Sequence, residues 1–127
     1  MMDGRPKRGM NRDLALKILA LCKLVKDALD DLLGTMFIIY QPTNYTGAVG
    51  TQAVFTVTAM NVAAYQWERS TDGGETWENA SGSGNQTSTL KFNVSNTNKV
   101  WNWRCSLTDA DNNTIYSDVV GIIVPTT

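Results

Sequence analysis

Three oxygen-bearing residues at alternate positions form the most metal-like spacing in the chain. Asp109, Asp111 and Asn113 have the 1-3-5 spacing of the ligands in a calcium-binding loop. An EF-hand needs Gly at its sixth position and a bidentate Glu at its twelfth, where this chain has Thr114 and Val120. The spacing therefore excludes an EF-hand. A polar hairpin turn is the favoured interpretation, a loose surface Ca²⁺ site stays open as the alternative, and we expect no metal cofactor.

A second candidate is the segment Ser70–Trp77, which has the S-x-D-x-G-x-T-W spacing of an Asp-box. Such boxes occur on the propeller blades of sialidases, so they suggest a glycosidase. A propeller needs repeated blades, however, and this chain has one box. We therefore expect a turn in which Asp72 accepts hydrogen bonds from turn amides and Trp77 packs beneath. Trp77 is also the candidate residue for stacking on a sugar ring.

The chain has no histidine, and this absence removes several kinds of chemistry. Ser-His-Asp and Cys-His catalysis and His-ligated zinc all require one. The two cysteines, Cys22 and Cys105, lie in segments of different character, so a disulfide between them is disfavoured and both are expected to be reduced and buried. Because no catalytic constellation is left, we expect a protein that is not an enzyme and has no cofactor.

Charge is distributed unevenly along the chain. Residues 1–36 contain seven Lys or Arg and five Asp or Glu, a net +2, whereas residues 37–127 contain four and seven, a net −3. Residues 1–11 lack periodicity and are predicted to form an extended arm with a basic tip. Since the arm has no interleaved aromatic residues, an acidic protein surface is favoured over nucleic acid as its partner. Its predicted contact residues are Arg5, Lys7, Arg8 and Arg12.

Residues 12–35 are predicted to form a helix that associates with itself or docks on a partner; packing against its own sheet is the alternative. Asn11 is the predicted N-cap and Gly34 the stop signal. Six apolar residues follow the 4-3-4-3-4 spacing of a coiled-coil seam, and further leucines widen the apolar stripe. The apolar run is too short for a secretion signal, and we expect no membrane contact. The seam residues are Leu14, Ile18, Leu21, Val25, Ala28 and Leu32.

Residues 37–124 are predicted to form about seven short strands, each bounded by turn residues. The most informative segment is 65–77, predicted as two strands around the turn Asp72-Gly73-Gly74, because glycine supplies the positive φ of a tight hairpin. Apolar residues alternate within the strands, which predicts a β-sandwich. The predicted strands are 37–41, 52–59, 63–70, 75–79, 87–95, 101–108 and 114–124.

Two motifs make residues 37–124 resemble the immunoglobulin-like domains of bacteria and bacteriophages. Tyr65–Trp77 matches the hairpin pattern YQW-x-x-STDGG-x-TW, and Trp101–Asp109 is similar to the strand pattern Y-x-Y-R-C-x-V-T-D. The resemblance covers 88 of 127 residues. It implies a mainly β fold, an immunoglobulin-like β-sandwich preceded by an N-terminal amphipathic α-helix and an extended arm. The residues that it places in the core are Trp67, Trp103 and Cys105.

The chain departs from the pattern of such domains at two positions. Trp103 stands where the pattern has Tyr, so a tyrosine-corner hydrogen bond is not expected. Val57 stands where antibody-type domains have the disulfide partner of Cys105. Cys105 is therefore expected to pack as a small apolar residue, which suits folding in a reducing bacterial cytoplasm.

The resemblance implies a non-enzymatic structural protein of a bacteriophage virion, such as a head fibre or capsid decoration. Residues 1–35 would anchor it to other virion proteins and join copies into a trimer or dimer, and the domain would project from the virion surface after assembly in the host cytoplasm. Weak binding to host-surface or mucus glycans, strengthened by multivalency, belongs to this expectation. The alternatives are a bacterial cell-surface adhesion module, a phage tail-associated immunoglobulin-like protein, and an accessory domain of a carbohydrate-active enzyme.

Overall fold

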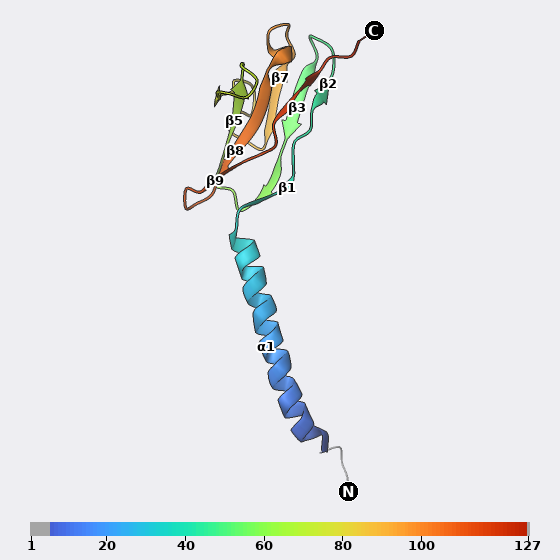
Figure 1. The fold of residues 1–127 in the computed structure, drawn as a ribbon, viewed down its shortest axis with the longest axis vertical. Coiled ribbons are helices and arrows are strands. Elements are labelled where there is room, and N and C mark those ends of the chain that lie inside the picture. The colour runs from blue at the N-terminus through green and yellow to red at the C-terminus, as the bar shows by residue number, and fades with distance from the viewer. Residues whose placement is uncertain (1–5, 127) are drawn as a thin grey trace. The chain divides into compact units, whose positions relative to one another are not determined.

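The computed structural model describes residues 6–126, with side chains described for residues 12–28 and 34–126. The chain divides into two units, an N-terminal unit of residues 1–35 and a β domain of residues 36–127. Among the described residues the first unit is helical and the second contains ten strands (Figure 1). The mainly β fold class with one N-terminal helix is therefore confirmed.

The N-terminal unit forms one helix, α1 (Pro6–Gly34). Pro6 occupies the first helical position, where its missing N–H is not needed and its fixed φ suits the helix. The predicted extended arm is therefore wrong for residues 6–11, which are helical, and Asn11 lies inside the helix rather than at its N-cap. Residues 1–5, the rest of the predicted arm, lie outside the described residues.

Every described side chain of α1 from Arg12 to Ala28 is exposed. Cys22 is among them, so the expectation that both cysteines are buried is wrong for Cys22, which lies on a helix that has no core of its own. Four seam residues with described side chains are between 48 and 61% exposed: Leu14, Ile18, Leu21 and Val25. The predicted contact residues whose side chains lie outside the described ones are Arg5, Lys7, Arg8 and Leu32.

The β domain has two layers of strands. One layer consists of β1 (Phe37–Tyr40), β4 (Thr58–Met60), β3 (Gln52–Thr56) and β7 (Thr89–Asn93). In this layer β1 pairs with β4 and β3 with β7, both antiparallel. β3 and β4 are consecutive in the chain and are separated at Val57, whose N–H donates to the Ser88 carbonyl (2.9 Å). The strand predicted over residues 52–59 is therefore divided at Val57 into β3 and β4, and Val57 is buried like Ala53 and Phe55.

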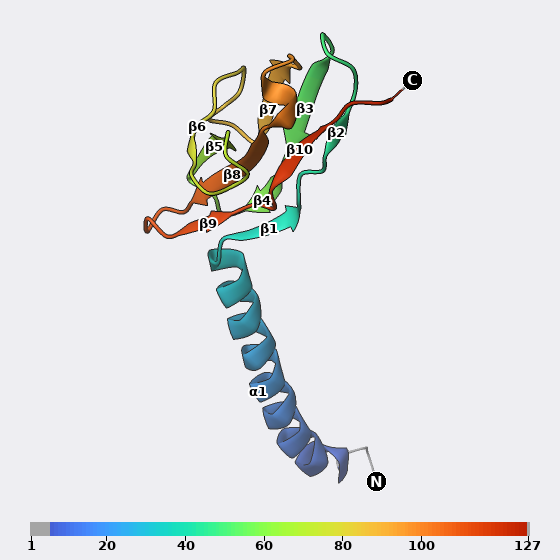
Figure 2. The same ribbon diagram turned by 45° about the horizontal axis from the view of Figure 1, so that its top comes forward.

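The second layer consists of β2 (Tyr45–Thr46), β10 (Val120–Ile123), β8 (Asn102–Thr108), β5 (Ala64–Ser70) and β6 (Glu78–Asn79) in that order, with β9 (Thr114–Tyr116) also paired to β8. β2 runs parallel to β10, and the other pairs are antiparallel. β9 and β10 are separated around Ser117, whose Oγ accepts the Cys105 N–H (2.8 Å). A 3₁₀ turn, η1 (Asn98–Val100), precedes β8. Figure 2 shows β5 and β8 side by side.

The segment 65–77 differs from the expected tight hairpin. β5 ends at Ser70 and β6 begins at Glu78, so residues 71–77 form a seven-residue loop. Residues 75–77, predicted as strand, belong to this loop. The physical reason is that the Asp72 side chain accepts hydrogen bonds from backbone N–H groups of the loop. These N–H groups therefore do not extend the pairing of β5 with β6. The short strand β2 was not predicted, because two residues carry too little periodicity to detect.

The core lies between the two layers and is built around Trp67. Trp67 on β5 is paired in register with Cys105 on β8, and both side chains are completely buried. Phe55 from the other layer lies against Trp67 and Trp103, with ring centroids 6.2 and 5.5 Å apart. The indole N–H of Trp67 donates to the Thr87 carbonyl (2.8 Å), so its burial leaves no polar atom unpaired. All three residues predicted for the core are buried in it.

The two cysteines should differ in reactivity. Burial raises the pKa of the Cys105 thiol to about 12, whereas Cys22 is exposed. Because the thiolate is the reactive form, we expect one thiol per folded chain, and two per denatured chain, to react with a chromogenic disulfide reagent at about pH 8. The Cys22→Ser variant is the control and should show no rapid reaction when folded. Rapid labelling of that variant would contradict the burial of Cys105.

Candidate functional site

The loop of residues 71–77 is held together by the carboxylate of Asp72. Its Oδ1 accepts the N–H groups of Glu75 (3.1 Å) and Thr76 (2.9 Å), and its Oδ2 accepts the Thr76 hydroxyl. The Ser70 hydroxyl also donates to Oδ1 (2.7 Å). These hydrogen bonds, with those from Thr76 the strongest, favour the ionised form and lower the pKa of Asp72 to about 2. Asp72 therefore organises the loop, as the turn interpretation of the Asp-box predicts, and is not poised for proton transfer.

Two glycines let the backbone of this loop turn. Gly73 and Gly74 have φ angles of 81° and 96°, a region that residues with side chains rarely adopt. The N–H of Gly74 donates to the Oγ of Ser70 (2.8 Å), whose side chain is buried under the loop. The Asp-Gly-Gly signal therefore marks a real change of direction, although the connection is longer than a tight hairpin.

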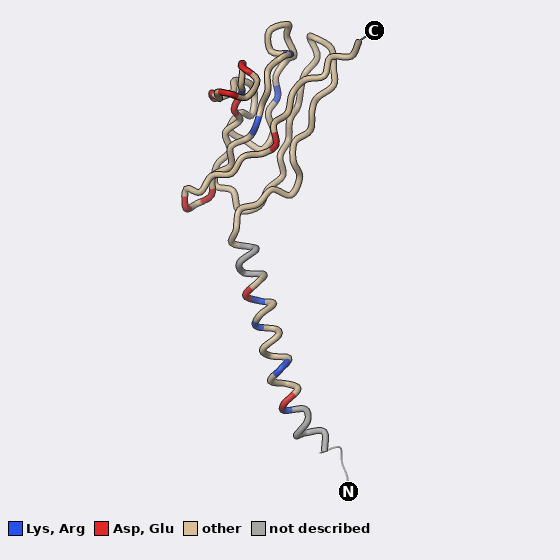
Figure 3. The backbone as a smooth tube through the Cα atoms, viewed as in Figure 1, with Lys and Arg blue, Asp and Glu red and all other residues tan. Residues whose placement is uncertain are grey.

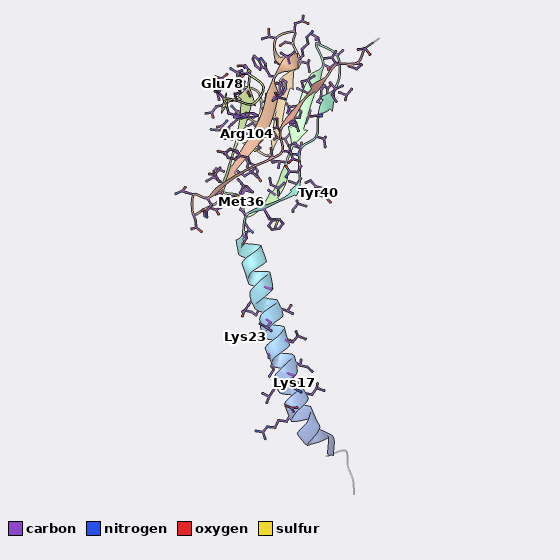
Figure 4. All side chains as sticks on the ribbon, viewed as in Figure 1. Lys17, Lys23, Met36, Tyr40, Glu78 and Arg104 are labelled. Carbon is purple, nitrogen blue, oxygen red and sulfur yellow. The ribbon has the colours of Figure 1, made fainter. Side chains whose placement is uncertain are left out.

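Trp77, the last residue of the loop, contacts Arg104 on β8. The Arg104 guanidinium carbon lies 4.3 Å from the centre of the Trp77 ring and 4.0 Å from the centre of the Tyr116 ring on β9. Its Nε donates to Glu68 Oε1 on β5 (2.8 Å). Figure 4 labels Arg104 among the side chains of the domain. We call these four residues the Arg104 cluster: Glu68, Trp77, Arg104 and Tyr116.

The register of β5 and β8 explains why the Arg104 cluster forms. Glu68 is paired directly with Arg104, and strand alternation puts both on the face opposite Trp67 and Cys105. The Arg104 and Glu68 side chains are only 22 and 19% exposed, whereas Tyr116 is 50% exposed. The guanidinium contacts two aromatic rings and the Glu68 carboxylate, and each cation–π contact contributes about 0.5–2 kcal/mol. The result is a rigid patch of aromatic and Arg side chains, the types enriched at binding hot spots.

The structure changes the interpretation of Trp77 as a sugar-stacking residue. Arg104 lies over both the Trp77 ring and the Tyr116 ring, so one side of each ring is already occupied, and Tyr116 is the more exposed of the two. Sequence reasoning missed Glu68, Arg104 and Tyr116 as neighbours of Trp77. Alternation in Trp101–Cys105 does place Arg104 on the face opposite Cys105, but its partners depend on the strand register, which the sequence does not reveal.

A second Arg–Glu pair lies close to Trp101. Arg69 Nε donates to Glu78 Oε1 (3.1 Å), and its guanidinium carbon lies 4.8 Å from the Trp101 ring centre. Glu78, labelled in Figure 4, is 60% exposed, so this pair contributes less than a buried one would. Trp101 is half-buried beside Trp103, with ring centroids 6.3 Å apart, and it therefore extends the core.

The residues with calcium-loop spacing form a polar turn. Asp109 Oδ1 accepts the N–H groups of Asp111 and Asn113, both at 2.9 Å, and Oδ2 accepts the Asn113 side-chain amide (3.1 Å). The hydrogen bonds from Asn113, first from its backbone N–H and then from its side chain, lower the pKa of Asp109. Within the part of the chain that the structure describes, no three carboxylate or thiol side chains gather as metal ligands. The geometry therefore supports the hairpin-turn interpretation.

The other described residues offer no further candidate site. Arg12, the one predicted arm-contact residue with a described side chain, is exposed on α1. Among the described residues, no buried side-chain nitrogen or oxygen lacks a hydrogen-bond partner. No helix in the described range is sufficiently long and apolar to cross a membrane.

Comparison with known proteins shows the class of the β domain. No protein-family model matches the chain, and no curated protein matches its sequence. The crystal structure of D1 of Duf (Kirre) is similar, with a TM-score of 0.50 and 15% identity over 73% of this chain and 99% of that one. D1-D2 of Rst gives a TM-score of 0.49 with 16% identity over 70% of this chain and 48% of that one. An immunoglobulin domain complex of titin M10 and obscurin-like 1 gives 0.48 with 13% identity, over 72% and 97%.

The fold of the β domain is immunoglobulin-like. At these identities the likeness shows the fold alone, so any function has to be argued from the residues themselves.

Replacing Asp72 by Asn should change how stability depends on pH. Because the folded pKa of about 2 lies below the ordinary 3.8, the ionised carboxylate stabilises the fold above about pH 4, and this contribution is lost as the pH falls toward 2. We expect D72N to lower the urea midpoint at pH 7 and to flatten the decline in stability between pH 4 and 2. Glu75→Gln, an exposed change in the same loop, is the control. The same acid dependence in D72N and the unchanged chain would contradict this role.

Removing Arg104 should destabilise the domain. Arg104→Ala leaves the half-buried Glu68 without its partner and removes two cation–π contacts, so we expect a loss of about 1–3 kcal/mol in the free energy of unfolding. Arg104→Lys keeps the charge but not the planar guanidinium, so its loss should be intermediate. Urea denaturation measures both, with Lys91→Ala on β7 as an exposed control. If R104A is as stable as K91A, the cluster does not hold the loop to the sheet.

Proposed function

We propose that this chain is a non-enzymatic structural and binding protein of a bacteriophage virion, a head fibre or capsid decoration. Residues 1–35 anchor it to other virion proteins and hold copies together, and the immunoglobulin-like domain is the displayed part. The observation that carries this proposal is the exposed apolar face of α1.

The apolar face of α1 is larger than a solitary helix would keep in water. Leu14, Ile18, Leu21, Leu24 and Val25 are each 48–67% exposed. Most helical stability in proteins comes from packing of an apolar face, and contiguous exposed apolar surface marks an association site. Complete burial of one such side chain contributes about 1.5–3 kcal/mol. Association with other copies supplies the packing that this face requires.

The β domain, by contrast, has a hydrophobic core of its own. Phe55, Trp67, Leu90 and Leu107 are each buried to at least 99%. Both cysteines are free, so the fold depends on packing rather than on a disulfide and suits assembly in a reducing cytoplasm. A domain of this kind can be carried as an independent unit on an anchor.

The virion setting is supported by the motifs in 65–77 and 101–109, which resemble those of bacterial and bacteriophage immunoglobulin-like domains. For a ligand, the Arg104 cluster offers Tyr116 and the uncovered part of Trp77 as aromatic surface. Such surface suits weak contacts with the sugar rings of host-surface or mucus glycans. Several copies on one particle would strengthen these contacts without any new interaction.

Single substitutions on α1 test the association. Ile18→Asp places a charge on the seam and should shift the full chain from oligomer to monomer in light-scattering measurements of mass. Leu19→Asp is the matched control, because Leu19 is similarly exposed but lies off the seam, and it should keep most of the oligomer.

Removal of residues 1–35 is the second test of the same proposal. The shortened chain should fold, be monomeric, and fail to incorporate into the assembled particle. A full chain that is monomeric at every concentration, or a shortened chain that still assembles, would overturn the proposed role of these residues.

A further inference from the structure

The charges of α1 are arranged against its own macrodipole. Its first turn contains no acidic residue and its last turn no basic one. Residues 6–20 contain four basic residues and one acidic residue, a net +3, whereas residues 21–34 contain two basic and three acidic residues, a net −1. Figure 3 shows the charged residues of its described part. Because the N-terminal end of a helix is the positive end of its dipole, this arrangement destabilises the helix when it is alone.

A second copy of α1 lying antiparallel would remove this conflict. The acidic C-terminal half of one helix would lie beside the basic N-terminal half of the other, and the two macrodipoles would oppose each other. A parallel copy would instead bring two basic halves together. Charge complementarity therefore favours a second, antiparallel copy as the occupant of the exposed face.

The apolar seam is compatible with this direction over its full length. Its 4-3-4-3-4 spacing is the same when read from either end, so an antiparallel copy can align all six positions. Ile18 then faces Ala28 of the second copy, and Leu21 faces Val25, so larger and smaller side chains oppose each other across the seam. In a parallel pair each position faces the same position of the second copy. Two small Ala28 side chains would then face each other and fill the seam poorly at that level.

The residues beside the seam also meet suitable counterparts in this register. Lys17 comes level with position 29 of the second copy, and position 31, where the sequence has Asp, lies two residues or about 3 Å farther along the axis. Two-fold symmetry repeats this approach on the other side of the pair. Within its own helix Lys17 pairs with Asp13 at 3.5 Å, but both side chains are 73% exposed, so that pair contributes little. Lys17 is labelled in Figure 4. Cys22 comes close to Cys22 of the second copy, near the two-fold axis.

We propose that α1 of two copies pairs antiparallel in this register, so that the chain is a dimer with its two immunoglobulin-like domains attached at opposite ends of one helix pair. This inference rests on the self-association in the proposed function and adds the direction and the number of copies. A helix of 29 residues spans roughly 40 Å, so each dimer could contact two separate surfaces, one at each end.

Cross-linking of the full chain tests the direction. With a short bismaleimide, the unchanged chain should form a covalent dimer through Cys22, and Cys22→Ser should form none because Cys105 is buried. Leu14→Cys in the Cys22→Ser background should also form none, since two antiparallel copies of position 14 lie about 27 Å apart along the axis. In a parallel pair these positions are adjacent. Light scattering on each variant before cross-linking establishes whether it self-associates.

The outcomes separate this inference from the proposed function. Cross-linking through position 14, in a chain that self-associates, overturns the antiparallel direction and leaves the proposed association intact. A mass that corresponds to a trimer overturns the dimer but not the association. A chain that stays monomeric overturns both. A dimer that cross-links through Cys22 and not through position 14 supports the inference.

A charge-reversal pair gives an independent measurement if Leu14→Cys disturbs the seam. Lys17→Asp should weaken the dimer several-fold, because it puts a second negative charge within about 3 Å along the axis of position 31 of the second copy, and adding Asp31→Lys should restore it. In a parallel pair positions 17 and 31 lie about 21 Å apart along the axis, so no restoration would occur. Failure of the double variant to recover would overturn the register.

Discussion

The pairing of β5 with β8 is the constraint on which the β domain depends. It places Trp67 beside Cys105 in the core, and strand alternation then places Glu68 beside Arg104 on the opposite face. A shift of one residue would exchange the two faces, burying a guanidinium and exposing an indole. One register therefore builds both the hydrophobic core and, on the opposite face of the sheet, the Arg104 cluster.

The loop of residues 71–77 shows how a motif that also occurs in sialidases serves structure in this chain. Asp72 uses its carboxylate to accept loop hydrogen bonds, and the loop then brings Trp77 against Arg104. The charged and aromatic groups thus stabilise one another, and what they offer a ligand is the surface left exposed, chiefly on Tyr116. Binding through such a preformed patch requires little ordering of side chains, which favours a weak contact repeated many times.

The two units of the chain obey different requirements. In the β domain a core of apolar side chains packs between the strands, and among the described residues no buried side-chain nitrogen or oxygen lacks a hydrogen bond. In α1 the described apolar side chains from residue 12 to residue 28 are exposed, and the charges oppose the helix dipole. Both features are unfavourable for a helix alone and favourable for a helix pair. The function that we propose, display of a self-sufficient domain on an associating anchor, follows from this difference.

The sequence by itself determined the features that depend on near neighbours along the chain. The 4-3-4-3-4 spacing indicated a helix, alternation indicated the strands, and the Ser70–Trp77 spacing indicated that Asp72 would hold a turn. It did not reveal that the helix begins at Pro6, because propensity at a helix end is weak. Only the tertiary structure decided which residues meet across strands: Glu68, Trp77, Arg104 and Tyr116 are far apart in sequence and are joined by strand register. Only it separated Cys22 from Cys105, because burial belongs to the environment of a residue and not to its type.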